Sequence, residues 1–249
     1  MSTARLRILP IFATLLALAS SPCWAAGKLL VDLSEEEIAI TTGFTGTELL
    51  LFGAKEERGD VVVVVSGPGR DAVVRRRERV AGVWVNGASV VFRGVPVYYR
   101  VASNRPLKEI APPEILSANG ITEGTLDLAG MTDVPAAQRV PFQDGLIRNR
   151  TRQGLYGYDP RGVAIQGDLL FRTAATFPAT VPTGPYSVNV YLFDRGKLAA
   201  HRESTLVVRK VGLGADVFNF AHRQSTLYGV IAIVVAVFAG WLAGVVFRR

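Results

Sequence analysis

The chain has 249 residues, and its 28 Lys and Arg residues against 21 Asp and Glu residues give a formal charge of +7. Arg5, Arg7, Arg248 and Arg249 flank the apolar segments at the two ends of the chain, and without them the charge falls to +3, so charge does not indicate a nucleic-acid partner. The single cysteine, Cys23, lies in the first apolar segment, which excludes disulfides, thiolate metal sites and cysteine nucleophiles from the remainder of the chain.

Residues 1–25 predict a secretory signal peptide. Arg5 and Arg7 precede an apolar stretch, residues 8–19, which is too short to span a bilayer comfortably, and small residues follow it. Such a segment directs the export of the part of the chain that follows, and cleavage then removes it. A retained N-terminal anchor is the competing interpretation.

Two cleavage positions agree with the small residues after the apolar stretch. Cleavage after Ala25 places Cys23 at the −3 position, whereas cleavage after Ala26 places the bulky Trp24 there, so we favour Ala25. Lipid attachment at Cys23 is a further alternative, but Pro22 directly before the cysteine disfavours it.

At the other end of the chain, residues 227–247 predict a transmembrane helix. The run 228–247 contains no charged residue, and a helix needs about 20 apolar residues to cross a bilayer core. The tail, 248–249, is a pair of arginines, which the positive-inside rule places in the cytoplasm. Residues 214–226 are expected to form a juxtamembrane linker. Together with the signal peptide, this pattern predicts a single-pass protein with almost all of its mass exported.

The exported region, residues 26–213, is predicted to be mainly β, as an immunoglobulin-like β-sandwich. Short apolar runs bounded by turn residues carry this prediction. The expected strands are 29–33, 37–42, 49–52, 61–65, 72–80, 83–85, 89–92, 97–101, 163–173, 186–193 and 197–210.

Two turn motifs predict hairpins. Asn86-Gly87 is expected to connect two strands directly, and Asp194-Arg195-Gly196 is expected to connect the last two. The phrase Pro182-Thr183-Gly184-Pro185-Tyr186 resembles the start of a late strand in immunoglobulin-like sandwiches.

A helical insertion is expected at about 106–158. Residues 106–118 could hold a short helix, and 136–156 have helical composition that is interrupted near Pro141. A buried stripe on this segment is expected from Phe142, Leu146, Ile147 and Leu155. Two small domains divided near residue 105 are the alternative.

A row of arginines is the first candidate for chemistry. Arg75, Arg77 and Arg79 alternate along a predicted strand, so their guanidinium groups would share one face, and Arg70 lies nearby in the sequence. Guanidinium groups match oxyanions such as a carboxylate, a sulfate-like anion or a lipid headgroup. The alternative is a solvated strand face whose charges block edge-to-edge pairing.

Catalytic and metal signals are weak. His201 and His222 lie far apart and have no spacing to other metal ligands, so no metal and no cofactor is expected. No serine lies in a GxSxG motif, and the chain is expected not to be an enzyme.

The predicted transmembrane helix carries small residues at every fourth position. Ala232, Ala236, Gly240 and Gly244 would line one face, which lets two helix backbones approach closely. Besides the lipid bilayer, the expected partner of this helix is another membrane protein or a second copy of the chain.

Several phrases resemble one known family. They are Phe44-Thr45-Gly46-Thr47-Glu48, Val83-Trp84-Val85-Asn86, Gly94-Val95-Pro96-Val97-Tyr98-Tyr99, the phrase ending at Tyr186, and the last residues of the chain. They occur in the same order in the alphaproteobacterial family described as putative transmembrane proteins. The resemblance implies an inner-membrane protein that faces the periplasm, with no assigned activity. It also implies an association with genes for sulfite-exporter-like permeases.

Three hypotheses follow. In the first, the exported domain is a binding or assembly module that is tethered beside a membrane partner, as an accessory to a permease. In the second, it is a periplasmic anion sensor or scavenger. In the third, it is a hydrolase whose site forms only in the folded protein.

Overall fold

Twelve β-strands form the body of the protein in a computed structural model that describes residues 29–123, 126, 128–212, 218 and 220–247. The predicted signal peptide, its cleavage positions, Cys23 and the Arg248-Arg249 tail lie outside these residues. The strands are β1 (Leu29–Leu33), β2 (Glu37–Ile40), β3 (Gly46–Lys55), β4 (Asp60–Ser66), β5 (Gly69–Val80), β6 (Val83–Pro96), β7 (Tyr99–Ser103), β8 (Tyr156–Asp159), β9 (Val163–Gln166), β10 (Leu170–Pro178), β11 (Gly184–Asp194) and β12 (Lys197–Lys210).

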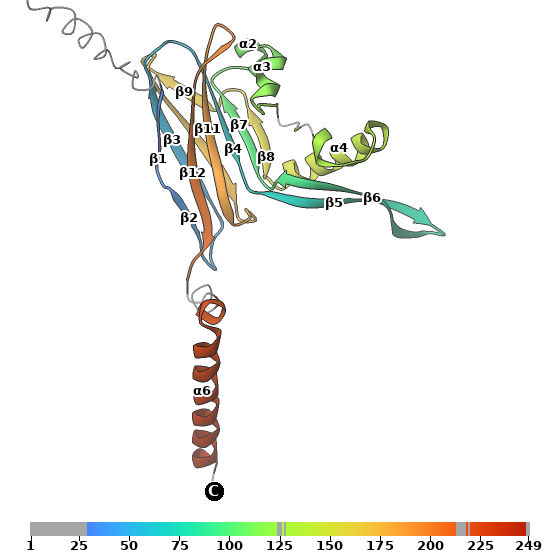
Figure 1. Cartoon of the computed structure of the whole chain (residues 1–249), viewed down its shortest axis with the longest axis vertical. Coiled ribbons are helices and arrows are strands. Elements are labelled where there is room, and N and C mark those ends of the chain that lie inside the picture. Colours follow the sequence, from blue (N-terminus) through green and yellow to red (C-terminus); the bar gives the residue numbers. More distant parts are fainter. Residues whose placement is uncertain (1–28, 124–125, 127, 213–217, 219, 248–249) are drawn as a thin grey trace, which may run out of the picture.

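Two packed sheets make the sandwich, and β5 and β6 stand apart as a separate hairpin (Figure 1). One sheet has four strands in the order β1-β3-β10-β9, and the other has six in the order β2-β12-β11-β4-β7-β8. The first two strands belong to different sheets. β1 pairs antiparallel with β3, and β2 pairs parallel with β12. The immunoglobulin-like β-sandwich expected from the sequence is confirmed.

The sandwich core is made without disulfides by apolar strands that face each other across the two sheets. The five valines of β4, residues 61–65, are at most 5% exposed, because β4 lies in the middle of its sheet with the sandwich on one side and further packing on the other. Burial of this much apolar surface is the main stabilising contribution in a domain of this kind.

Three aromatic rings close one end of this core. The ring of Tyr98 stacks on Phe177 with a centroid distance of 4.8 Å, and both rings meet Tyr186 edge-on at 5.7 Å. The hydroxyl of Tyr186 donates to the carbonyl oxygen of Pro182 at 2.6 Å, four residues upstream, which is the tyrosine corner of immunoglobulin-like domains. Burial raises the pKa of Tyr186 to about 12, so its hydroxyl remains a donor at neutral pH.

The hairpin β5–β6 turns at a different place from the one expected. Its turn is Ala81-Gly82, where both φ angles are positive (50° and 86°), as a type I′ turn requires. Asn86-Gly87 lies inside β6 instead, at an irregularity in the strand pairing. The prediction of a turn at Asn86-Gly87 was therefore wrong, because the observed register is the one that places Ala72 opposite Phe92 in a buried cluster.

The strand expected at 163–173 is also divided. Gly167 and Asp168 both have positive φ angles, and Leu170 pairs with Gln166, so β9 and β10 form a tight hairpin. The hairpin expected at Asp194-Arg195-Gly196 is present, with Asp194 paired to Lys197.

The segment between β7 and β8 carries the helices. They are α2 (Leu107–Ile110), α3 (Pro113–Ala118), the short 3₁₀ helix η1 (Ala129–Met131) and α4 (Ala136–Arg152). Helix α4 runs through Pro141 rather than breaking there. It ends in a Schellman motif, in which Gly154 adopts a φ of +72° and the amide of Leu155 donates to the carbonyl of Arg150.

A second, smaller apolar cluster joins the hairpin to these helices. Phe142 and Leu146 of α4, together with Leu128, pack against Phe92 and Val90 of β6. Of the stripe expected on this segment, Ile147 and Leu155 instead contact the core of the sandwich. Helix α4 thus fills the space between the two clusters, and the inner half of the hairpin is held by it.

The C-terminal helix α6 (Ser225–Val246) is separate from the sandwich (Figure 1). It has 22 residues and a mean hydropathy of 2.5 in its most apolar window. Among the described residues it is the one helix that is long and apolar enough to cross a membrane.

Candidate functional site

The outer face of the four-stranded sheet carries large apolar side chains, although a solvated sheet face normally presents polar ones. Leu30, Leu50, Phe52 and Leu170 are between 43% and 67% exposed there. The strand register places Leu30 and Leu170 on either side of Ala54, so that the set is contiguous across three strands. We call Leu30, Leu50, Phe52, Ala54 and Leu170 the apolar sheet face.

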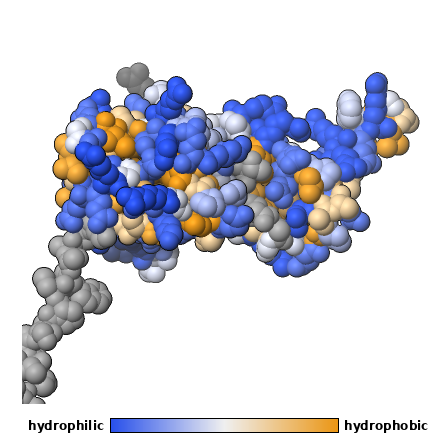
Figure 2. Space-filling model, turned by 90° about the horizontal axis from the view of Figure 1, so that it is seen from above, coloured by the Kyte–Doolittle hydropathy of each residue, from blue (hydrophilic) through white to orange (hydrophobic). Residues whose placement is uncertain are grey.

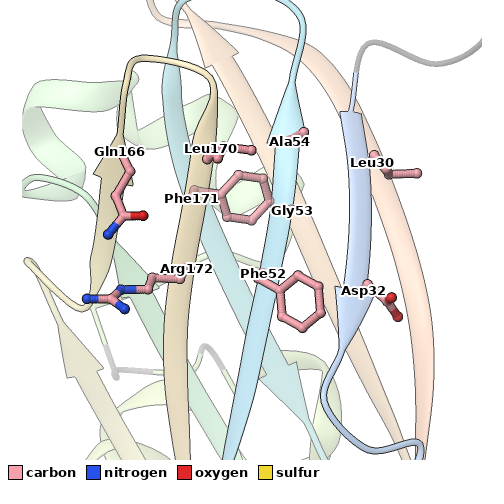
Figure 3. A pocket seen from close by; sticks show the side chains of 9 residues that line it. All are labelled: Leu30, Asp32, Phe52, Gly53, Ala54, Gln166, Leu170, Phe171 and Arg172. Carbon is pink, nitrogen blue, oxygen red and sulfur yellow. The ribbon is translucent and has the colours of Figure 1, made fainter.

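A hollow of about 330 Å³ lies in the apolar sheet face (Figure 3). Leu30, Phe52 and Leu170 are among the residues that line it. Asp32 and Arg172 pair with Phe52 from its two sides, so one acidic and one basic group lie beside an apolar surface. This arrangement fits an apolar side chain of a partner, with the two charges fixing its orientation.

Gly53 lies directly under the hollow, where the ring of Phe171 crosses β3 (Figure 3). A Cβ atom at this position would lie 2.5 Å from the Phe171 ring and 2.2 Å from the carbonyl oxygen of Leu30. Only glycine permits this close approach, and the floor of the hollow depends on it.

The change Gly53→Ala is expected to destabilise the protein by about 1–3 kcal/mol, because the new methyl group forces β1 away from β3. Denaturant unfolding of the purified protein in detergent measures this. Gly43→Ala is the matched control, since a Cβ there would meet nothing within 4 Å. Equal unfolding midpoints for the two variants would show that the contact under the hollow carries no strain.

The predicted arginine row lies on the free-standing hairpin. Arg75, Arg77 and Arg79 are all exposed on β5, and Arg79 pairs with Trp84 of β6. Trp84 is 64% exposed, and its partner in the strand register is Arg79.

Arg70 is separated from that row. It lies at the root of the hairpin, and its guanidinium group donates to the carbonyl oxygen of Thr183 at 2.8 Å. This bond ties the hairpin to the segment that enters β11. Arg70 therefore has a partner within the fold. Arg75, Arg77 and Arg79 remain together on the exposed part of β5.

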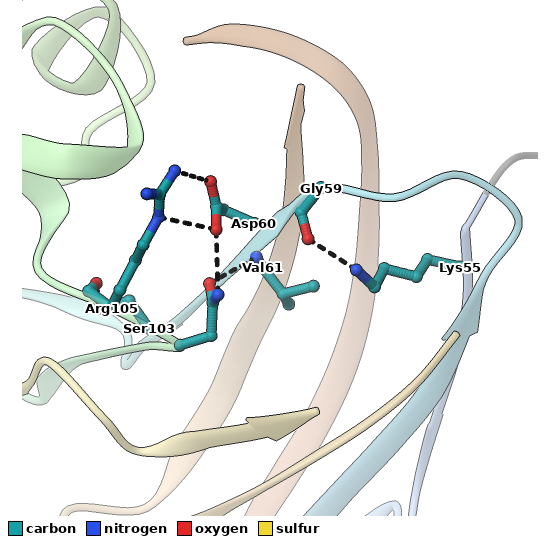
Figure 4. A network of polar contacts seen from close by, with 7 residues as sticks. Lys55, Gly59, Asp60, Val61, Ser103 and Arg105 are labelled. Carbon is teal, nitrogen blue, oxygen red and sulfur yellow. Dashed lines mark hydrogen bonds and ion pairs between the residues drawn. The ribbon is translucent and has the colours of Figure 1, made fainter. Parts of the chain in front are cut away.

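A polar network at the opposite end of the sandwich is structural (Figure 4). The carboxylate of Asp60 accepts two bonds from the guanidinium group of Arg105 and a third, at 3.0 Å, from the amide of Asn104. Asn104 also accepts a bond from the backbone of Val61 at 2.9 Å. The network fixes the start of β4 to the segment that follows β7, and its acceptor oxygens are used within the fold.

Lys55 is a buried cation near this network. It is 4% exposed, and its Nζ donates to the carbonyl oxygen of Gly59 at 2.6 Å (Figure 4). Burial lowers the pKa of Lys55, while Asp60 and Asp168 act in the opposite direction. The bond closes the loop between β3 and β4.

Neither histidine lies in a metal site. The ring of His201 stacks on Tyr191 at 4.6 Å and bonds to Asn189, and His222 contacts Phe218. Within the described part of the chain, no three His, Cys, Asp or Glu side chains gather closely enough to hold a metal ion.

Helix α6 has no buried residue, and its row of small residues faces outward from the protein. A Cβ atom on Gly240 or Gly244 would meet nothing within 4 Å. The surface that Ala232, Ala236, Gly240 and Gly244 share therefore has no partner among the described residues of this chain.

The fold and these surfaces can be set beside known proteins. The family model described as "Putative transmembrane protein (Alph_Pro_TM)" matches residues 28–249. The chain belongs to this family. The match runs through the sandwich, the hairpin and α6, and it confirms the resemblance found in the sequence motifs. A search of curated proteins found none that matches the chain.

The apolar sheet face of this transmembrane protein was not identified from its sequence. The signal was present in β3, where Leu49 to Phe52 are apolar at four successive positions, although a strand with one solvated face should alternate. Only the register shows that Leu50 and Phe52 share a surface with Leu30 and Leu170, which come from strands far apart in the chain.

Proposed function

We propose that the protein is a non-enzymatic, single-pass inner-membrane protein whose periplasmic sandwich is a binding or assembly module for another membrane protein. The observation that carries this proposal is the apolar sheet face with its hollow. Single exposed apolar residues are common, but a contiguous set on a rigid sheet, with a hollow in it, is typical of an interaction surface.

The membrane helix gives this surface its context. Family membership and α6 support attachment to a membrane, so the sandwich is confined to a layer near the bilayer. Confinement raises the effective concentration of any membrane partner, and a modest surface then suffices for binding. The row from Ala232 to Gly244 offers a second contact inside the membrane. A sulfite-exporter-like permease is the partner to which the family resemblance points.

The anion-sensor alternative has less support. It relies on Arg70, Arg75, Arg77 and Arg79 acting together, but Arg70 is bonded to Thr183 at the root of the hairpin. The other three lie on an exposed strand, where water screens their charge from a small anion.

Photo-crosslinking from the two surfaces tests the proposal. A crosslinking amino acid at Leu170, in the apolar sheet face, is expected to capture one specific membrane protein in native membranes, which mass spectrometry identifies. The same group at Glu203, exposed on β12 in the other sheet, is the control and is expected to capture nothing specific.

A second arm connects the capture to the hollow. Leu170→Arg is expected to abolish co-purification of the captured protein while α6 still inserts into the membrane. A captured set that is the same from Leu170 and Glu203, or co-purification that survives Leu170→Arg, would overturn the proposal. A crosslinker at Gly244, with Leu242 on the opposite face of α6 as its control, tests the membrane contact in the same way.

A further inference from the structure

The outer half of the β5–β6 hairpin is an arm that has no packing role in the fold. Its inner half contacts the second cluster through Ala72, Val74 and Val90, and Arg76 lies over the ring of Phe142 at 5.2 Å. Beyond Arg76, β5 and β6 pair with each other and contact no other element among the described residues. Figure 1 shows this arm extending away from the sandwich.

The end of the arm combines apolar and aromatic side chains with arginines. Val80, Val83 and Trp84, around the Ala81-Gly82 turn, are 58%, 64% and 64% exposed. Figure 2 shows hydrophobic residues gathered at the far end of the arm beside hydrophilic ones. Arg79 and Trp84 lie opposite each other in the strand register, and the guanidinium group of Arg79 donates to the carbonyl oxygen of Gly82 in the turn at 3.3 Å. We call residues 75–87 the hairpin tip.

The hairpin tip is strongly basic. It carries four arginines, at positions 75, 76, 77 and 79, against the single acidic residue Glu78. Arg76 lies over the ring of Phe142, so Arg75, Arg77 and Arg79 are the arginines available to a surface. The Glu78 carboxylate folds back over Gly87, since a Cβ atom on that glycine would lie 2.5 Å from its oxygen. The outward surface of the tip is therefore positive along one strand and apolar at the turn.

The root of the hairpin lies at the end of the sandwich from which the chain leaves for the membrane helix. Pro68, just before β5, contacts Gly184, which pairs with Val208 near the end of β12. β12 ends at Lys210 and α6 begins at Ser225. The twelve residues of β5 extend for about 40 Å at the usual rise of a strand.

We propose that the hairpin tip docks on the anionic phospholipid surface of the same bilayer that α6 crosses. Tryptophan and short apolar side chains partition to the headgroup level, and arginines bind phosphate groups in pairs of hydrogen bonds. A surface of anionic phospholipids carries the charge opposite to that of the tip, and α6 keeps the two close, so a small contact is enough. This inference does not depend on a protein partner at the apolar sheet face.

Docking would fix the orientation of the sandwich above the bilayer. With α6 as one point of attachment and the hairpin tip as a second, two separate contacts would hold the domain to the membrane. The apolar sheet face would then point in one defined direction along the membrane.

The test uses the full-length protein in lipid nanodiscs, with Trp24→Phe and Trp241→Phe so that Trp84 is the one remaining tryptophan of the three in the sequence. In discs that contain phosphatidylglycerol, lipids with a quencher near the headgroup are expected to remove most of the Trp84 fluorescence. In discs of phosphatidylcholine alone, we expect little quenching. High salt is expected to release the tip, because the attraction is electrostatic.

A charge-matched pair of variants makes the assignment specific. Replacing Arg75, Arg77 and Arg79 with Gln is expected to abolish the quenching. Replacing three exposed arginines elsewhere, Arg148, Arg161 and Arg195, with Gln is expected to leave it unchanged. Circular dichroism that matches the parent protein shows that each triple variant is folded. Trp84 quenching that is absent in phosphatidylglycerol discs, equal in both kinds of disc, or insensitive to the first triple variant would overturn the inference.

Discussion

The change Phe177→Ala is expected to destabilise the sandwich by about 3–5 kcal/mol, the usual cost of removing a fully buried phenyl ring. Phe177 is 0% exposed and stacks on Tyr98 at 4.8 Å, so its removal leaves a cavity and also weakens the support of Tyr186. In a domain without disulfides, this is a large part of a typical stability. Denaturant unfolding of the protein in detergent, followed by near-ultraviolet circular dichroism, measures the loss.

Phe52→Ala is the control for this change. Phe52 is 43% exposed on the apolar sheet face, so its removal is expected to cost less than about 1 kcal/mol. A loss at Phe177 no larger than that at Phe52 would mean that the aromatic cluster does not hold the two sheets together.

The change Phe92→Ala is expected to cost a similar 3–5 kcal/mol, but only in the second cluster. Phe92 is 0% exposed between the hairpin and α4, and that cluster is separate from the core of the sandwich. Local unfolding free energies differ between such units. Hydrogen exchange is therefore expected to accelerate in β5, β6 and α4 while β4 and β11 keep their protection.

Val91→Ala, one position along the same strand and 44% exposed, controls for the loss of a side chain from β6. Protection lost to the same extent in β4 as in β5 would show that the two clusters unfold as one unit.

Much of the fold could be predicted because local patterns and packing agree. The valine run of β4 and the Asp194-Arg195-Gly196 turn are strong signals that the rest of the chain does not oppose. At Asn86-Gly87, the local turn pattern and the packing of the second cluster disagree. A turn there would move Val74 and Ala72 away from their partners Val90 and Phe92, so burial of the second cluster prevails over the local turn preference.

The candidate sites were predictable only in part, because local patterns do not specify which strands become neighbours. The alternation of Arg75, Arg77 and Arg79 is a local property of one strand, and the sequence is enough to place them on one face. The separation of Arg70 and the assembly of the apolar sheet face depend on which strands become neighbours. The bond from Arg70 to Thr183 and the pairing of β3 with β10 join residues more than a hundred positions apart, and no local pattern specifies them.

The parallel pairing of β2 with β12 determines how the domain bears mechanical load. The tether to α6 leaves from the C-terminal end of β12, which lies between β2 and β11. Tension on the tether would pull β12 along its own length, so the hydrogen bonds to both neighbours would be strained together and not broken one after another. The strand order therefore distributes a pull from the membrane over the hydrogen bonds on both sides of β12.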